Sequence, residues 1–281
     1  MADTRYPQRM SPFLRHIRAC NTAVLPGARL PFLISGATVG YVAPPFADVL
    51  AGFPAITRGP AGVTLHDPAA LPAIARAVAA RGYGRHRAEA FDVRATPGGP
   101  ALTTIDRGAL PVFGIMAEGI HANGLVRRAD GLHLWVAKRA ADKALDPGKL
   151  DHIVAGGTPA GLTAFETWIK EAAEEAAIPL DLAQTARLTC TISYAMDRPE
   201  GLRRDVLHCY DIDLPETFTP TPADGEVESF ALWPIADVLA AVRDTDAFKF
   251  NVNLVLIDLF LREGLIPAPE AAKLRAALQH G

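Results

Sequence analysis

Three glutamates, Glu171, Glu174 and Glu175, are the residues whose types and spacing most clearly favour chemistry. They lie at positions i, i+3 and i+4 of residues 156–178, GGTPAGLTAFETWIKEAAEEAAI, a pattern typical of a helix entered through a glycine-rich turn. At about 100° per residue, the three carboxylates share one face of that helix and repel one another there. A divalent cation would reverse this repulsion. Mg²⁺ prefers oxygen ligands and is usually held by a few carboxylates together with substrate phosphates.

The neighbouring residues predict how this helix is built. Thr163 followed by Glu166 matches a capping box, and Gly161 allows the preceding loop to turn sharply. A stripe on a neighbouring face is expected to meet a core and comprises Phe165, Trp168, Ile169, Ala172 and Ala176. Taken alone, glutamates on a helix are also typical of a solvated surface. The glycine loop and the fixed spacing favour the metal site.

This segment resembles the Nudix box, whose pattern is G-x5-E-x7-R-E-U-x-E-E-x-G-U. On that spacing, Gly156 takes the first glycine and Ile178 the closing apolar position. The resemblance implies that Glu171, Glu174 and Glu175, with the carbonyl of Gly156, hold Mg²⁺ or Mn²⁺.

Three positions depart from the box pattern. Leu162 stands at the first glutamate, Ala177 at the last glycine and Lys170 at the arginine. In the family the first glutamate is largely structural and pairs with the arginine. Because Glu166 lies one helical turn before Lys170, we expect that ion pair to have moved to these two residues.

Further short motifs resemble one subgroup of the Nudix hydrolases. They lie at residues 119–124, 134–139, 147–151, 154–157, 224–228 and 249–251. This subgroup carries an uncharacterised N-terminal domain and is fused to thiamin pyrophosphokinase in some fungi. Its members are similar to hydrolases that convert oxidised or deaminated analogues of thiamin diphosphate to monophosphates. The resemblance implies an α/β fold, a Nudix α/β/α sandwich with a mixed sheet, preceded by a smaller α/β N-terminal domain.

Basic and polar residues before the box are candidates for binding the substrate. Lys138, Arg139, Lys143 and Lys149 cluster there and are suited to neutralise diphosphate oxygens, although strand-end cations are also typical of simple solvation. His121 and Asn123 alternate on a strand, so both point to one face and are candidates for lining a pocket. A strand histidine is also typical of packing.

The expected reaction is Mg²⁺-dependent hydrolysis of an organic diphosphate, in which X-P-P and water give X-P and phosphate. The expected substrate is thiamin diphosphate or an oxidised or deaminated analogue. Glu226 and Glu228 fall where the family often has another acidic residue, so Glu171, Glu174, Glu226 and Glu228 are the catalytic candidates. The base would be one of the last three.

Other functions fit the same fold. One alternative is a hydrolase of nucleoside diphosphate derivatives such as ADP-ribose, and another is a non-catalytic module that binds a metabolite. An isomerase of isopentenyl diphosphate type would need a reactive cysteine beside an acid, and no cysteine lies in the box.

The remaining patterns concern domains and elements. The 281 residues, 49% of them apolar, predict an N-terminal α/β domain over 1–111 and a Nudix domain over 112–281. Strands are expected at 31–42 as a hairpin and at 91–94, 112–128, 132–139, 187–197, 204–213 and 229–233. Helices are expected at 11–21, 45–52, 68–81, 234–243 and 251–262.

Net charge and cysteine content indicate which partners and which compartment to expect. A net charge of −3 argues against a nucleic-acid partner. The apolar run 254–261 is interrupted by Asp258 and too short to span a bilayer, so no membrane partner is expected. Cys20, Cys190 and Cys209 lack metal-ligand spacing and suit a reducing compartment, and the N-terminus has no secretory pattern. A cytoplasmic location is therefore expected, with a small-molecule diphosphate as the ligand.

Overall fold

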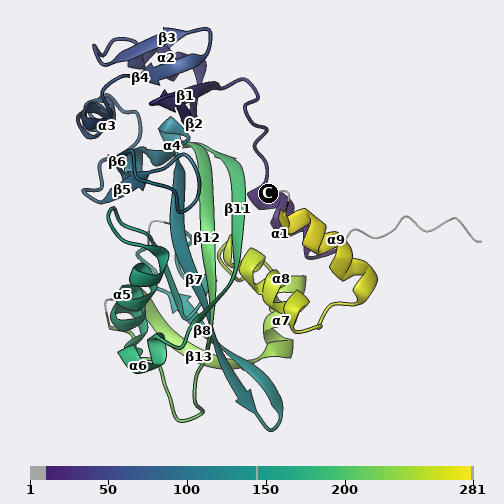
Figure 1. Cartoon of the computed structure of the whole chain (residues 1–281). Coiled ribbons are helices and arrows are strands. Elements are labelled where there is room, and N and C mark those ends of the chain that lie inside the picture. Colours follow the sequence, from purple (N-terminus) through teal and green to yellow (C-terminus); the bar gives the residue numbers. More distant parts are fainter. Residues whose placement is uncertain (1–10, 144, 224, 280–281) are drawn as a thin grey trace, which may run out of the picture.

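A seven-stranded mixed sheet forms the centre of the molecule (Figure 1). The computed structural model describes residues 11–143, 145–223 and 225–279, so Asp224 of the motif at 224–228 lies outside the described residues. Five strands run in the order β11–β12–β7–β8–β13, while β10 pairs with β7 and β9 with β8. Their bounds are β7 Met116–Arg128, β8 Gly131–Arg139, β9 Leu150–Asp151, β10 Val154–Gly157, β11 Arg187–Arg198, β12 Gly201–Asp213 and β13 Val227–Pro234. The β12–β7 pair is parallel, whereas β7–β8, β8–β13 and β11–β12 are antiparallel.

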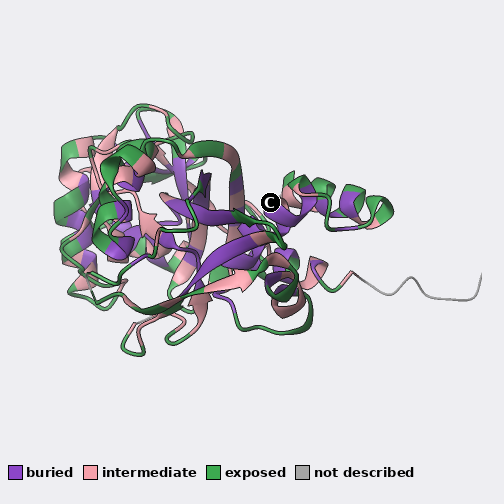
Figure 2. Ribbon diagram, turned by 90° about the horizontal axis from the view of Figure 1, so that it is seen from below, coloured by how far each residue is buried: buried purple, intermediate pink, exposed green. Residues whose placement is uncertain are grey.

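Helices cover both faces of this sheet because its strands are apolar on both sides. Along β7, Ile120 and Ala122 pack with Trp168 of α5 (Ala164–Ala176), and α6 (Leu180–Ala183) joins them. Leu125 faces the other way, into the cluster that holds α8 (Val252–Arg262). On that second side also lie α1 (Leu14–Cys20), α7 (Ile235–Asp244) and α9 (Ala268–Gln279). Figure 2 shows the buried residues running through the middle of these layers. The predicted α/β/α sandwich is confirmed.

A smaller α/β unit precedes the sandwich, as predicted, and has its own core. One sheet has the order β2–β1–β4–β3, and a second pairs β5 with β6. Their bounds are β1 Leu30–Ile34, β2 Ala37–Val42, β3 Ile56–Gly59, β4 Gly62–Leu65, β5 Ala90–Val93 and β6 Thr103–Asp106. The helices are α2 (Pro44–Leu50), α3 (Leu71–Ala79) and α4 (Leu110–Phe113), with 3-10 turns η1 (Pro68–Ala70) and η2 (Arg107–Ala109). The four-residue strands β3, β4 and β6 were not predicted, because such short runs carry little periodicity.

Two features depart from the sequence-based expectation. Helix α1 belongs to the first 111 residues, yet its Phe13, Ile17 and Cys20 pack in the same core as α8. The boundary after residue 111 therefore stays a prediction. Phe165 is expected in the buried stripe of α5, but 41% of it is exposed; in the first turn of the helix its ring meets that of Tyr210 at 6.3 Å between centroids and is partly open to solvent. Among the described residues, none of the helices has the length and hydropathy that crossing a membrane requires.

The packing of α5 predicts a large stability difference between two aromatic residues. Trp168 is fully buried, donates from Nε1 to the carbonyl of Ala183 at 2.8 Å and stacks on Tyr210. We expect Trp168→Ala to lower the free energy of unfolding by about 3–5 kcal/mol, because it removes the ring and leaves a cavity. Phe165→Ala is the matched control and should cost about 1 kcal/mol or less. Urea unfolding measures both, and equal losses would contradict this account.

Candidate metal and diphosphate site

The helix that carries the glutamates begins with the predicted capping box. Glu166 N donates to Thr163 Oγ1 at 3.1 Å, and Thr163 N donates to Glu166 Oε2 at 2.8 Å. This use of Glu166 explains why the predicted Glu166–Lys170 pair is wrong. Lys170 instead pairs with Glu174 at 2.5 Å and with Glu171 at 3.1 Å. The partners of Lys170 are therefore two of the proposed metal ligands, Glu171 and Glu174.

The helix ends where the box would have its last glycine. Ala177 occupies this position with φ of 53°, in the left-handed region that favours glycine. An alanine there costs about 1 kcal/mol relative to the unstrained backbone. The helix therefore ends as the family pattern implies, even though the glycine is replaced.

Glu171 and Glu175 meet the backbone that precedes the glycine loop. Glu175 is buried, and its Oε2 accepts a hydrogen bond from Ala155 N at 2.9 Å. The side chain of Glu171 lies directly against Gly156: a methyl group on this glycine would come within 2.8 Å of Glu171 Cγ. Glu226 lines the same small pocket as Glu175, across from α5. The structure therefore brings Gly156, Glu171, Glu175 and Glu226 to one place.

The electrostatics of this place suit a hard divalent cation. Burial raises the pKa of Glu175 well above its usual value, the nearby Asp151, Glu171 and Glu226 carboxylates raise it further, and the Ala155 N–H acts in the opposite direction. Burial also raises the pKa of Glu171, which Lys170 opposes and Glu226 reinforces. Oxygen donors that crowd one another in this way are the ligands that Mg²⁺ and Mn²⁺ prefer.

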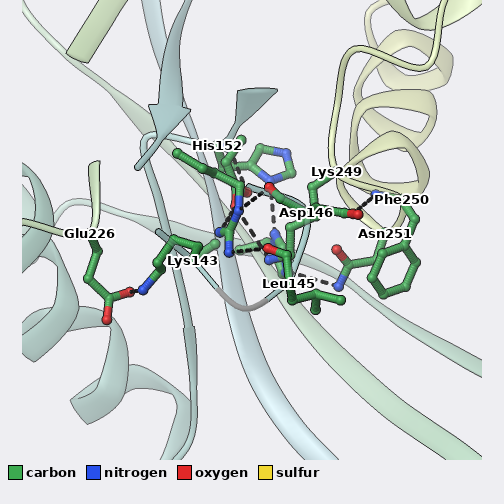
Figure 3. Close-up of polar contacts among 12 residues, drawn as sticks. Lys143, Leu145, Asp146, His152, Glu226, Lys249, Phe250 and Asn251 are labelled. Atoms are coloured by element: carbon green, nitrogen blue, oxygen red, sulfur yellow. Dashed lines mark hydrogen bonds and ion pairs between the residues drawn. The ribbon is translucent and has the colours of Figure 1, made fainter. Parts of the chain in front are cut away.

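The other acidic candidates stand at the edge of this group. The side chain of Glu174 is 50% exposed and holds Lys170. Glu228 is likewise half-exposed and accepts a hydrogen bond from Lys138 Nζ at 2.8 Å across the β13–β8 pair. Glu226 forms an ion pair with Lys143, which Figure 3 shows apart from the larger polar network. Of the candidate bases, Glu226 is the one that lines the pocket.

Arg139 lines the same pocket as Glu175 and Glu226, but its guanidinium is held by protein partners. Arg139 is largely buried; its Nη1 donates to Asp151 at 2.7 Å, and its other nitrogens donate to the carbonyls of Leu145 and Asp146. The backbone of Lys149 lies beside Arg139, whose N–H donates to the Lys149 carbonyl at 2.9 Å. The geometry therefore does not favour diphosphate binding by Arg139, and the role of Lys149 stays a prediction.

His121 and Asn123 share one face of β7, as the alternation predicted, but that face is the one covered by α8. His121 Nδ1 lies 2.9 Å from His152 Nδ1, and its Nε2 lies 3.4 Å from Asn251 Nδ2. Asn123 Nδ2 donates to Asp211 Oδ1 at 2.8 Å. Both residues are buried among protein partners, which favours a packing role over substrate contact.

Asp151 lies in the motif at 147–151, but its residue type and spacing alone do not mark it as part of the site. This buried carboxylate accepts hydrogen bonds from Arg139 and from Lys249, the latter at 3.4 Å, and Figure 3 shows Lys249 and Asn251 on the α8 side of the network. Burial alone would raise the pKa of Asp151, but Lys249, the two histidines and Arg139 outweigh it, so the pKa lies below its usual value.

His121, Asp151 and His152 also bring nitrogen and oxygen atoms within 4.8 Å of one another, as in a metal site. The charges argue against a cation there, because Arg139 and Lys249 already neutralise the single carboxylate. Burial lowers the pKa of His152 to about 4, so its ring is neutral at physiological pH. We assign the three residues to the structural network.

Glu175→Gln should make the metal-free protein more stable at neutral and alkaline pH. Below the usual pKa of 4.5, the carboxyl is neutral in folded and unfolded chains, so the two proteins differ little. As the pH rises through the raised pKa of the folded protein, burial of the ionised group costs free energy in the wild type only. Thermal unfolding in chelator from pH 4 to 9 tests this. Glu174→Gln, which removes an exposed ion pair, should give no such gain.

Asp151→Asn should destabilise the fold by about 3–5 kcal/mol, because Arg139 and Lys249 lose their buried counter-charge. Since the pKa of Asp151 is lowered, its contribution is present above the usual 3.8 and is lost as the pH falls toward the lowered value. The exposed Asp213, paired with Arg127 and Arg187, is the control, and Asp213→Asn should cost about 1 kcal/mol or less. Comparable losses in urea unfolding at pH 7 would argue against a buried charge cluster.

Comparison with known proteins agrees with this architecture. Residues 119–253 match the family described as NUDIX domain, and residues 12–117 match a domain of unknown function, DUF4743. Nudix hydrolase 24, chloroplastic, of Arabidopsis thaliana is 38% identical over 270 residues, which are 92% of this chain and 74% of that protein. Nudix hydrolase 20, chloroplastic, of the same plant is 36% identical over 283 residues, which are 94% and 75%.

Among solved structures, DR0079 from Deinococcus radiodurans is 22% identical, with a TM-score of 0.46 over 60% of this chain and 97% of that chain. The two plant relatives extend the likeness over both the N-terminal unit and the sandwich. With the box helix, the mixed sheet and these relatives together, the chain belongs to the Nudix hydrolase family.

Proposed function

We propose that this hydrolase cleaves an organic diphosphate in the presence of Mg²⁺ or Mn²⁺, so that X-P-P and water give X-P and inorganic phosphate. The observation that carries the proposal is the convergence of Glu171 and Glu175 on the backbone at Ala155 and Gly156, with Glu226 at the same pocket. Burial and the neighbouring acids disfavour the charged form of Glu175, and no described basic residue pairs with it, whereas Glu171 pairs with Lys170 and Glu226 with Lys143. A divalent metal would supply the counter-charge that Glu175 lacks.

In this proposal, Glu171, Glu174 and Glu175 hold the metal. The carbonyl of Gly156, which the resemblance implies as a further ligand, is directed toward β7, since its oxygen would lie 2.8 Å from a methyl group on Gly119. The bound metal would offset charge on the phosphate oxygens and lower the pKa of a water molecule. The rigid α5 fixes Glu171 and Glu175, because the helix is packed on the sheet through Trp168. Glu226 is the favoured base among Glu174, Glu226 and Glu228, since it is the one of the three that lines the pocket. Each of the three pairs with a lysine, Glu226 with Lys143, so ion pairing does not distinguish them.

For the organic group we propose thiamin or its oxidised or deaminated analogues. The support is the resemblance of the short motifs, among them residues 119–124, 147–151 and 249–251, to the subgroup that acts on such diphosphates. In the structure, the last two of these motifs contribute Asp151, Lys249 and Asn251 to one buried network, so they belong together in space as well.

Phosphate release tests the reaction and the substrate together. The wild type with Mg²⁺ should release phosphate from thiamin diphosphate analogues faster than from thiamin diphosphate. ADP-ribose and nucleoside diphosphate sugars give two organic monophosphates and no inorganic phosphate when cleaved, so their cleavage is followed by chromatography of the products and should be slower. Glu171→Gln and Glu175→Gln should each lose turnover by roughly 10²-fold or more, because each removes a charge from the site that stabilises the transition state. Glu216→Gln, an exposed carboxylate paired with Arg128, is the control. Undiminished turnover in both site variants would remove these glutamates from the mechanism.

We also propose a reducing, cytoplasmic setting. Cys20, Cys190 and Cys209 are all free thiols. Cys190 and Cys209 lie opposite each other on β11 and β12 without forming a disulfide, which fits a reducing compartment.

A further inference from the structure

The loop between β10 and α5, residues 158–163, is held from outside the sandwich by the N-terminal unit. Ala160 N donates to the carbonyl of Ala90 at 2.8 Å, so the loop joins the outer edge of β5. Gly161 N donates to Asp92 Oδ2 at 3.1 Å. In Figure 1, the β5–β6 pair lies next to the start of α5. The N-terminal unit therefore touches the segment that connects the glycine turn to the glutamate helix.

These two hydrogen bonds complete the backbone pairing of the loop. The other N–H groups donate within the sandwich: Thr158 to the carbonyl of Glu118, Leu162 to that of Pro159 and Thr163 to the carboxylate of Glu166. Pro159 has no N–H to donate. Every backbone donor of the loop is thus paired, and the two in its middle depend on the N-terminal unit. Without that unit, the middle of the loop would lose both acceptors.

A side chain of the same strand packs against the glycine turn. Phe91 is 3% exposed, and a methyl group on Gly157 would come within 2.6 Å of its Cζ atom. The guanidinium of Arg107 lies over the Phe91 ring at 5.5 Å and is itself paired with Glu89. The ring is therefore fixed, and it sets how far the backbone at Gly157 can move.

The carboxylate of Asp92 is equally well held. Arg94 Nη2 donates to it at 2.6 Å, and Arg94 Nε lies 3.7 Å from Glu118 Oε1 of β7. Glu118 also pairs with His208 at 2.7 Å, which ties the chain of contacts to β12. Asp92 therefore presents a fixed acceptor to the loop, anchored in the sheet of the sandwich.

We infer that Phe91 and Asp92 are positioning residues of the metal site: together they fix the loop that joins the glycine turn to the helix bearing Glu171 and Glu175. The inference rests on the proposed function for the identity of the site. It assigns to the N-terminal unit the task of holding the metal ligands in place. Neither residue touches metal or substrate, so their effect is transmitted through Gly157 and Gly161.

Metal binding in the absence of substrate tests this role. Titration calorimetry with Mn²⁺ on the full chain should show about 10-fold or more weaker binding for Asp92→Ala and Phe91→Leu, a loss typical of groups that orient metal ligands. Hydrogen exchange of the amides at residues 158–163 should accelerate in both variants. With an active diphosphate, kcat should fall more than KM rises, because the ligands are misplaced and the substrate contacts are kept.

Two further variants separate positioning from general stability. Asp92→Asn keeps an oxygen acceptor for Gly161 and should restore most of the Mn²⁺ affinity that Asp92→Ala loses. Val93→Ala removes a buried side chain from the same strand, in the N-terminal core, where Val93 pairs with Thr103. It should lower the melting temperature without changing Mn²⁺ affinity or exchange at residues 158–163.

The inference is overturned if Asp92→Ala and Phe91→Leu, both folded by thermal unfolding, bind Mn²⁺ as the wild type does. It is also overturned if the wild type binds no Mn²⁺, or if Val93→Ala weakens binding as much as they do. Failure of the proposed function looks different: the wild type would bind Mn²⁺ and release no phosphate from any diphosphate. Weaker Mn²⁺ binding by the two variants would still support the positioning role in that case.

Discussion

The burial of the Glu175 carboxylate beside Glu171 and Glu226 is the constraint on which the site depends. A carboxylate removed from water is stable only if it is protonated, paired or bound to a metal. Ala155 N–H supplies one hydrogen bond, and the neighbouring acids oppose ionisation further. The fold therefore holds these groups close together at a cost in stability, which is a cost expected of a site prepared for a cation.

Asp151 is a second buried carboxylate, and its surroundings differ from those of Glu175. It is as buried as Glu175, yet Arg139 and Lys249 surround it, and its pKa falls where that of Glu175 rises. Among the residues described, Glu175 forms no salt bridge, although Asp151 is near enough to act on it. Environment therefore divides the two acids: the neutralised one stabilises the strand leading to the glycine turn, and the other remains available to a metal.

The N-terminal unit holds the loop that joins the glycine turn to the glutamate helix. Its core is separate, but its strand β5 reaches the loop of the sandwich through Ala90, Phe91 and Asp92. A glycine-rich loop has many accessible conformations, so holding it requires acceptors and packing from elsewhere. A second unit placed against that loop meets this requirement, whereas α1 packs beside α8 and ties the beginning of the chain to the far face of the sheet.

The sequence by itself determined the box helix, its capping box and the long strands, because periodicity and spacing are local properties of the chain. The sandwich and the smaller unit before it followed from the resemblance to the Nudix subgroup. It also predicted that Glu171, Glu175 and Gly156 lie close together, since the i, i+4 spacing puts both glutamates on one helix face and the fixed loop length limits how far Gly156 can lie from that face. Only the tertiary structure decided that Glu174 is half-exposed, that Arg139 serves Asp151, and that His121 and Asn123 face α8. Those outcomes depend on which residues distant in sequence supply burial and counter-charge, and the pattern around each residue does not encode them.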